Sequence, residues 1–188
     1  METTVDVQEI YRRAGAGFAA RVHRVGGRWT DPTPLPGWDV RALVHHLVEE
    51  QRWAPPLLAG ETIEQVGDRF AGDLLGSDPV PAFDAAAAAA REAVEAQGAL
   101  QRTVHLSFGD CPGREYVMQL AADHLVHTWD LARALGVDEA LDPAATTAVR
   151  DWFADHEPAY RQAGLIGPRV DAGPGPTAEL LGMFGRTP

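Results

Sequence analysis

Asp123 and His127 form a pair of side chains that could bind a metal ion from one face of a helix. They are four residues apart, which places them on adjacent turns of that face. Tyr116, Leu120 and Leu131 recur on the same face at helical spacing, so it is expected to point toward the core. An ionised carboxylate on such a face is costly unless it is paired, hydrogen-bonded or bound to a cation. The pair therefore indicates a candidate metal site.

A third ligand must come from another element, and the long helical segment over residues 39–59 offers His46. This histidine lies at the edge of an apolar face that also carries Leu43 and Leu47, whereas the neighbouring His45 points away from it. Three ligands from two facing helices would leave coordination positions open for water or substrate. That arrangement is typical of a catalytic metal site rather than a structural one.

The same residues also fit readings other than this ligand set. The histidines could be satisfied core or surface side chains, with Asp123 hydrogen-bonded to an arginine. His124 also lies on the apolar side of its helix, and a His124/His127 pair three residues apart is a rival set of ligands.

Two nearby acidic residues have several interpretations each. Glu50 lies one turn beyond His46 and could be a fourth ligand, a base or a solvated side chain. Asp130 is one turn from His127 and could orient its ring as a hydrogen-bond acceptor. The sequence supports an ion pair between Asp130 and Arg133 equally well.

Other catalytic chemistries have no motif in this sequence. HExxH, HxxEH, P-loop and GxSxG patterns are all absent. The single cysteine, Cys111, excludes an intramolecular disulfide and a cysteine-based zinc site. Its neighbours Asp110 and Pro112 do nothing to stabilise a thiolate, so a catalytic cysteine is not expected.

Helical periodicity dominates the chain, and alternating strand patterns are nearly absent. A proline-rich stretch, residues 30–37, separates the first two helices, and Pro55-Pro56 interrupts the second one late. The tail holds Pro168, Pro174 and Pro176 and is expected to wrap over the molecule in extended form. The expected elements are long helices over 7–25, 39–59, 82–99, 115–135 and 143–162, a short helix over 63–70 and a strand over 103–108.

Composition and charge limit the classes of protein to which this sequence can belong. A length of 188 residues with 45% apolar content predicts one globular domain spanning 1–188. The net charge of −11 disfavours nonspecific binding to nucleic acid and docking on anionic membranes. The first residues lack a signal-peptide pattern, and no segment is apolar for long enough to span a membrane. A cytoplasmic location is therefore expected.

Two stretches resemble signatures of one family. Residues 33–47, TPLPGWDVRALVHHL, resemble the signature of DinB-like metal-binding proteins, and more narrowly of the branch related to the N-terminal domain of mycothiol-dependent maleylpyruvate isomerase. Residues 123–134, DHLVHTWDLARA, are similar to the second signature of that branch. Residues 72–79 and 184–188 add further similarity, so the resemblance covers nearly the whole chain.

This resemblance implies an all-α fold, a DinB-like four-helix bundle with additional short helices and an extended C-terminal tail. It assigns His46, Asp123 and His127 as the metal ligands, with Asp123 standing where Glu or His is often found. The shorter reach of Asp could loosen the site or require a bridging water. The implied cofactor is a divalent metal, zinc being favoured over nickel or iron.

The implied activity is that of a mycothiol-dependent transferase or isomerase, in which a metal-bound thiolate attacks a small electrophile. The partners are then a low-molecular-weight thiol and the electrophile, and a homodimer is left open. Maleylpyruvate isomerisation itself is not expected, because the isomerase has a second, C-terminal domain, whereas this sequence is expected to form one domain only. Two alternatives stay open: a non-catalytic metal-binding or dimerisation module, and a metal-assisted hydrolase or cyclase of a biosynthetic pathway.

Overall fold

A computed structural model describes residues 6–188, which are mostly helical. The elements follow in the order α1 (Val7–Val22), α2 (Val40–Ala59), α3 (Ile63–Val66), α4 (Pro79–Glu95), a 3-10 helix (Ala99–Gln101), β1 (Thr103–Leu106), β2 (Gly109–Pro112), α5 (Gly113–Leu135), α6 (Pro143–Gln162) and α7 (Pro176–Met183). This architecture confirms the predicted all-α, DinB-like fold.

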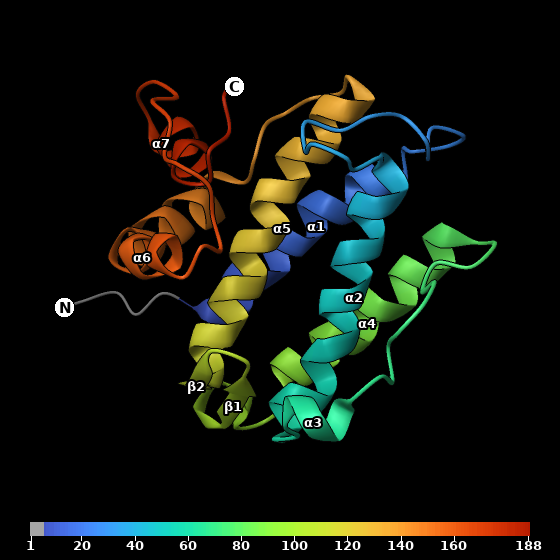
Figure 1. The fold of residues 1–188 in the computed structure, drawn as a ribbon, viewed down its shortest axis with the longest axis vertical. Coiled ribbons are helices and arrows are strands. Elements are labelled where there is room, and N and C mark those ends of the chain that lie inside the picture. Colours follow the sequence, from blue (N-terminus) through green and yellow to red (C-terminus); the bar gives the residue numbers. More distant parts are fainter. Residues whose placement is uncertain (1–5) are drawn as a thin grey trace.

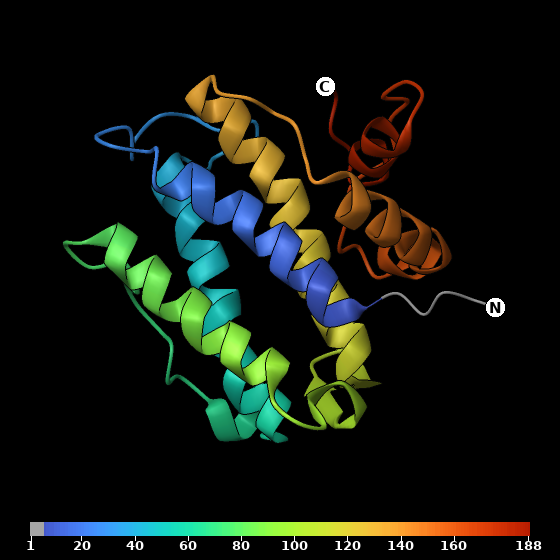
Figure 2. The same ribbon diagram turned by 180° about the vertical axis from the view of Figure 1, so that it is seen from behind.

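Four long helices, α1, α2, α4 and α5, form the bundle. Figure 1 shows α2 and α5 in front, with α1 behind α5 and α4 behind α2, and Figure 2 shows the reverse side. Helix α6 packs beside α5 outside the bundle and carries α7 on it. The buried apolar residues of the bundle fall into two clusters, one around Phe18, Leu43 and Phe83 and the other around Leu58, Leu125 and Leu180.

Helix α3 is shorter than the expected 63–70 and α4 begins and ends a few residues earlier than the expected 82–99, but the largest differences from the sequence-based expectation concern three other elements. Helix α2 runs unbroken through Pro55 and Pro56 to Ala59, because the buried residues Leu57 and Leu58 anchor its last turn despite the lost backbone donors. The segment after residue 108 pairs with the predicted strand as an antiparallel hairpin, in which Val104 is opposite Cys111. The tail is extended at first, as predicted, but then forms helix α7, which was not predicted.

The start of α2 determines how its histidines face the bundle. Asp39 caps the helix, because its carboxylate accepts a hydrogen bond from the backbone N–H of Ala42 at 2.8 Å. The buried residues Leu43 and Leu47 then turn one side of α2 into the core. His46 lies next to Leu47 at the edge of this side, toward α5.

The C-terminal segment folds back over α6 and α5. The backbone N–H of Val170 donates to the carbonyl of Gly182 at 3.0 Å. A Cβ atom at Gly182 would lie 2.5 Å from the carbonyl oxygen of Val170, so this close approach requires glycine. The approach holds α7 in place and brings Arg186 back to α5.

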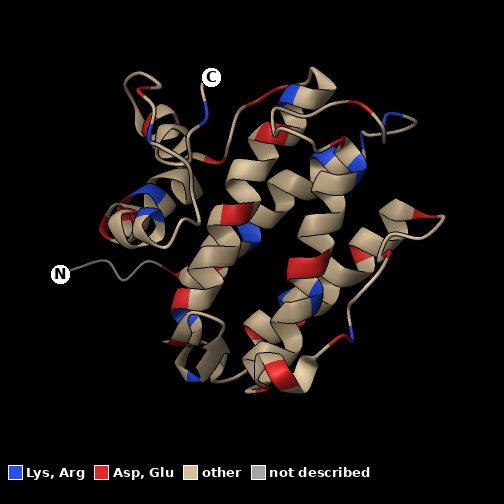
Figure 3. Ribbon diagram, viewed as in Figure 1, with Lys and Arg blue, Asp and Glu red and all other residues tan. Residues whose placement is uncertain are grey.

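Charged residues are distributed over the whole fold. Figure 3 shows arginines interspersed with aspartates and glutamates along the helices and loops. None of the helices within residues 6–188 is both long enough and apolar enough to cross a membrane.

Candidate metal centre

The structure brings His46, Asp123 and His127 together between α2 and α5. His46 Nε2 lies 2.9 Å from Asp123 Oδ2, and His127 Nε2 lies 3.4 Å from Asp123 Oδ1. One ligand atom from each of the three residues lies within 4.8 Å of the other two. Two imidazole nitrogens and a carboxylate oxygen form a donor set typical of catalytic zinc or non-haem iron. The residues present therefore fit the divalent ion that the sequence resemblance implies.

The short side chain of Asp123 reaches both histidines. Its two oxygens face one imidazole each, so Asp123 contacts both histidines directly. The helical spacing explains the contact with His127, and the close packing of α2 on α5 explains the contact with His46.

Asp130 fixes the ring of His127 from its other nitrogen. His127 Nδ1 is 2.9 Å from Asp130 Oδ2, and this carboxylate is fully buried. A carboxylate at Nδ1 leaves Nε2 to face Asp123 and His46, which is the orientation that a metal-ligating histidine needs. Of the two interpretations of Asp130, orientation of His127 is thus the one seen; Arg133 pairs with Glu139 instead.

Arg186 completes this chain of contacts, and sequence reasoning did not assign it a role. Its Nε and Nη2 atoms donate to the two oxygens of Asp130 at 3.1 and 2.8 Å, a bidentate pair. The pair neutralises a carboxylate that would otherwise be costly to bury. The only sequence signal was the resemblance of the closing residues 184–188 to the same family.

Trp38 covers the two histidines from the solvent side. Its ring stacks parallel to His127 with centroids 6.3 Å apart and meets the His46 ring edge-on at 5.3 Å. The indole remains 36% exposed, so it shields the site without closing it. Unlike Trp38, Trp129 is buried beside Arg133 and does not contact the candidate ligands.

The three candidate ligands shift one another's pKa. Burial favours neutral imidazoles, but the carboxylate of Asp123 outweighs it, raising the pKa of His46 and raising that of His127 to about 9. Burial alone would raise the pKa of Asp123, yet the two histidines hold it well below its usual range. Without a cation, the carboxylate is therefore stabilised by protons on its neighbours.

This arrangement predicts that the metal-free protein loses stability as pH rises from about 6.5 to 9. The pKa of His127 is raised in the folded state, so its stabilising contribution is complete below 6.5 and is lost as pH rises through about 9. The loss is at most about 3 kcal/mol, from the free-energy equivalent of the shift. Urea unfolding at several pH values with chelator present measures it, and a flat profile over this interval would contradict the assignment. His127→Gln, which cannot titrate, is the control expected to remove the part of the slope that His127 contributes and to leave the part from His46, whose pKa is also raised.

The remaining histidines of α2 and α5 lie elsewhere. His45 Nε2 contacts the carbonyl of Gly72 at 2.9 Å and the N–H of Leu74 at 3.2 Å, so it anchors the loop before α4. His124 is buried toward α1 and α4, beside Tyr11 and Phe18. The rival ligand pair His124/His127 is thus excluded by geometry, because the two rings face different sides of α5.

A cavity of about 470 Å³ opens directly beside the three candidate ligands, which all line it. Glu50 and Tyr116 also line it, and α6 and the tail supply an aromatic and apolar wall that includes Trp152 and Phe184. Burial and then the charge of Asp123 raise the pKa of Glu50 to about 7. Glu50 thus faces the cavity but is not part of the ligand cluster found within residues 6–188.

Cys111 lies outside this site on β2. Burial, together with the charge of Glu115, raises the pKa of its thiol. This agrees with the prediction that Cys111 is not a catalytic thiolate.

The comparisons with known proteins decide the family. The mycothiol maleylpyruvate isomerase N-terminal domain family matches residues 11–132. This chain belongs to that family. The match contains His46, Asp123, His127 and Asp130, whereas Arg186 lies beyond it.

Relatives within Mycobacterium tuberculosis extend the comparison. Two uncharacterized proteins, one from each of two strains, are 33% identical to this chain over 149 residues. The aligned region covers 74% of this chain and 72% of each relative. No solved structure matches the chain significantly. Membership in the family supports the theme of mycothiol dependence, and the geometry supplies the accompanying candidate metal site.

Proposed function

We propose that this protein binds one divalent metal ion, zinc being favoured, through His46, Asp123 and His127, and acts as a thiol-dependent transferase or isomerase on a small electrophile. The observation that carries the proposal is that the three candidate ligands line an open cavity of about 470 Å³. A structural ion is normally enclosed by protein ligands, whereas a catalytic ion keeps positions open to small molecules. The cavity is in the size range of small-molecule sites.

A bound divalent ion would act there as a Lewis acid, lowering the pKa of a thiol and holding the sulfur beside its target. The protein holds the ligand set in position. Asp130 and Arg186 orient His127, and Trp38 limits access of water from one side. The family relationship points to mycothiol as the thiol.

Tyr116 is the side chain best placed to bind the electrophile. Its hydroxyl is buried and has no hydrogen-bond partner within residues 6–188, yet the residue lines the cavity beside Glu50 and Asp123. Burial raises the pKa of this phenol well above its usual value, so it remains a hydrogen-bond donor. We propose that it donates to an oxygen of the substrate.

The proposal treats residues 1–188 as one domain that works in the cytoplasm, where low-molecular-weight thiols stay reduced. An aromatic and apolar wall and an unpartnered hydroxyl fit an uncharged or weakly polar electrophile with an acceptor oxygen. Sulfur forms a bond to the electrophilic carbon, a leaving group such as chloride departs with the bonding electrons, and the thiol proton passes to solvent.

Thiol conjugation by metal-loaded protein tests this function. With mycothiol and 1-chloro-2,4-dinitrobenzene, we expect a rate that saturates in the thiol and disappears on chelation. Tyr116→Phe should lower kcat/KM about 10-fold or more, as expected when a hydrogen bond in the transition state is lost, without changing metal content. His45→Ala, which alters a loop anchor, is the control that should keep the activity. Metal binding without any saturable thiol reaction would favour the non-catalytic module, and hydrolysis without thiol would favour the hydrolase.

A further inference from the structure

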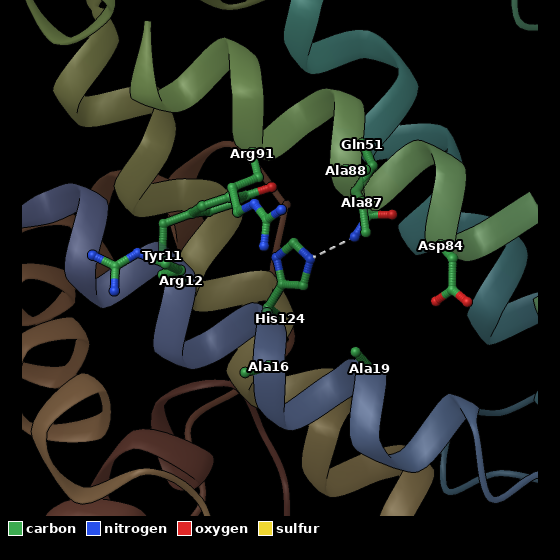
Figure 4. Close-up of a pocket in the computed structure, with 11 residues that line it drawn as sticks. Tyr11, Arg12, Ala16, Ala19, Gln51, Asp84, Ala87, Ala88, Arg91 and His124 are labelled. Atoms are coloured by element: carbon green, nitrogen blue, oxygen red, sulfur yellow. Dashed lines mark hydrogen bonds between the residues drawn. The ribbon is translucent and has the colours of Figure 1, made fainter.

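A second cavity lies on the opposite side of the bundle from the candidate metal centre. It has a volume of about 290 Å³ and opens between α1 and α4, the two helices in front in Figure 2. Gln51 of α2 and His124 of α5 contribute to its lining from within the bundle, and Figure 4 shows their side chains meeting there. The function proposed above makes no use of this cavity.

The hydrogen bonds of His124 fix the orientation of the Gln51 amide. His124 Nδ1 lies 2.6 Å from the carbonyl oxygen of Leu120, an acceptor, so Nδ1 carries the proton. The ring is only 1% exposed and neither of its nitrogens contacts a carboxylate among residues 6–188, so it is neutral and Nε2 is left as an acceptor. The Gln51 Nε2 amide therefore donates to His124 Nε2 at 2.9 Å.

This orientation leaves the amide oxygen of Gln51 without a donor. Gln51 is only 2% exposed, and its Oε1 atom has no hydrogen-bond partner among residues 6–188. A buried carbonyl oxygen without a partner is rare in folded proteins, and its usual explanation is a water or a ligand. Because Gln51 lines the cavity, a molecule bound there can supply the missing N–H or O–H.

The walls of the cavity combine small apolar residues with two arginines, Arg12 and Arg91, and one carboxylate, Asp84, which pairs with His23 at 2.8 Å. Ala87 and Ala88 line it from α4, and Arg91, one turn further along α4, extends toward the same space in Figure 4. Arg91 makes no ion pair or hydrogen bond within the described residues 6–188, whereas Arg12 at the rim pairs with Glu9 and Glu95. An arginine of this kind is suited to bind a carboxylate.

We propose that this cavity is a binding site for a small organic carboxylate that also carries a hydroxyl or amino group. The carboxylate would pair with Arg91, the N–H or O–H would donate to Gln51 Oε1, and the apolar part would lie on the alanines of α4. The proposal is independent of the metal and of thiol chemistry, so it can fail or succeed without affecting the proposed function.

Titration of the purified protein by NMR tests the site with two matched probes, 4-hydroxyphenylacetate and phenylacetate. We expect both to shift the side-chain signals of Gln51, Arg91 and His124. The hydroxylated acid should bind at least about 10-fold more tightly than phenylacetate, because only its hydroxyl can donate a hydrogen bond to the buried Oε1 atom of Gln51. Equal affinities, or no shifts at these residues with either acid up to millimolar concentration, would overturn the proposal and leave water as the partner of Gln51.

Three variants locate the binding. Arg91→Gln should weaken both acids at least 10-fold, since the ion pair is lost while the residue remains exposed and polar. Ala88→Leu should fill the cavity and abolish binding. Ala89→Leu is the matched control, because Ala89 is exposed on the same helix but does not line the cavity, and it should bind as the wild type does. Binding that survives Ala88→Leu would place the acids elsewhere and contradict the proposal.

Discussion

Replacing His46 or His127 by Ala is expected to remove most of the metal from the protein. Wild-type protein purified without chelator should contain about one equivalent of divalent metal per chain, as an open three-ligand site implies. With either histidine gone, two ligands remain, which is too few to hold the ion through purification. Elemental analysis by mass spectrometry of dialysed protein measures this difference.

His45→Ala is the matched control for that experiment. His45 is adjacent to His46 in α2 but contacts Gly72 and Leu74 instead of the ligand cluster. The variant should keep its metal even if the loop before α4 loosens. Loss of metal from His45→Ala but not from His46→Ala would show that the proposed ligand register is wrong.

Asp130→Asn should give an intermediate result in the same assay. The substitution keeps the shape of the side chain but removes the charge that faces His127 Nδ1 and Arg186. Changes of this kind beside a metal-ligating histidine cost about 10- to 100-fold in metal affinity. The variant should therefore bind metal when it is in excess and lose it in dialysis sooner than the wild type.

Removing the metal is expected to lower the melting temperature strongly while the protein stays helical. The bundle buries large side chains such as Phe18, Leu43 and Phe83 without any help from the site, unlike a zinc finger. Free metal at 100 to 1,000 times its dissociation constant adds about 3 to 4 kcal/mol by linkage. For a chain of this length, that corresponds to a fall of about 6 to 16 °C on chelation.

Circular dichroism and thermal melting before and after chelation measure this effect. Helical signal at room temperature should be nearly unchanged, and readdition of metal should restore the original melting temperature. His46→Ala is the control, because its melting temperature should respond little to chelator. A collapse of the helical signal on chelation would make the site structural and would count against the proposed catalysis.

The sequence by itself determined the helices and the relation between neighbouring turns. Helical periodicity is local, so the apolar stripes of α2 and α5 predict that His46 rather than His45 faces α5 and that Asp123 and His127 share a face. The same reasoning located most of the long helices within a few residues. It predicted an interruption at Pro55-Pro56 that the structure does not show, and it predicted no helix after Pro176, because packing against the core outweighs the local effect of proline at both places.

Only the tertiary structure decided how distant segments complete the two sites. Asp130 could equally have paired with Arg133, one turn away, but the folded tail places Arg186 on it from 56 residues further along the chain. His124 could equally have joined His127 on a metal, yet the packing of α5 against α1 and α2 gives it Gln51, which is 73 residues away, as its partner. Residue spacing fixes which side chains share a helix face, whereas the partners across the core depend on how whole helices pack, and no local pattern encodes that.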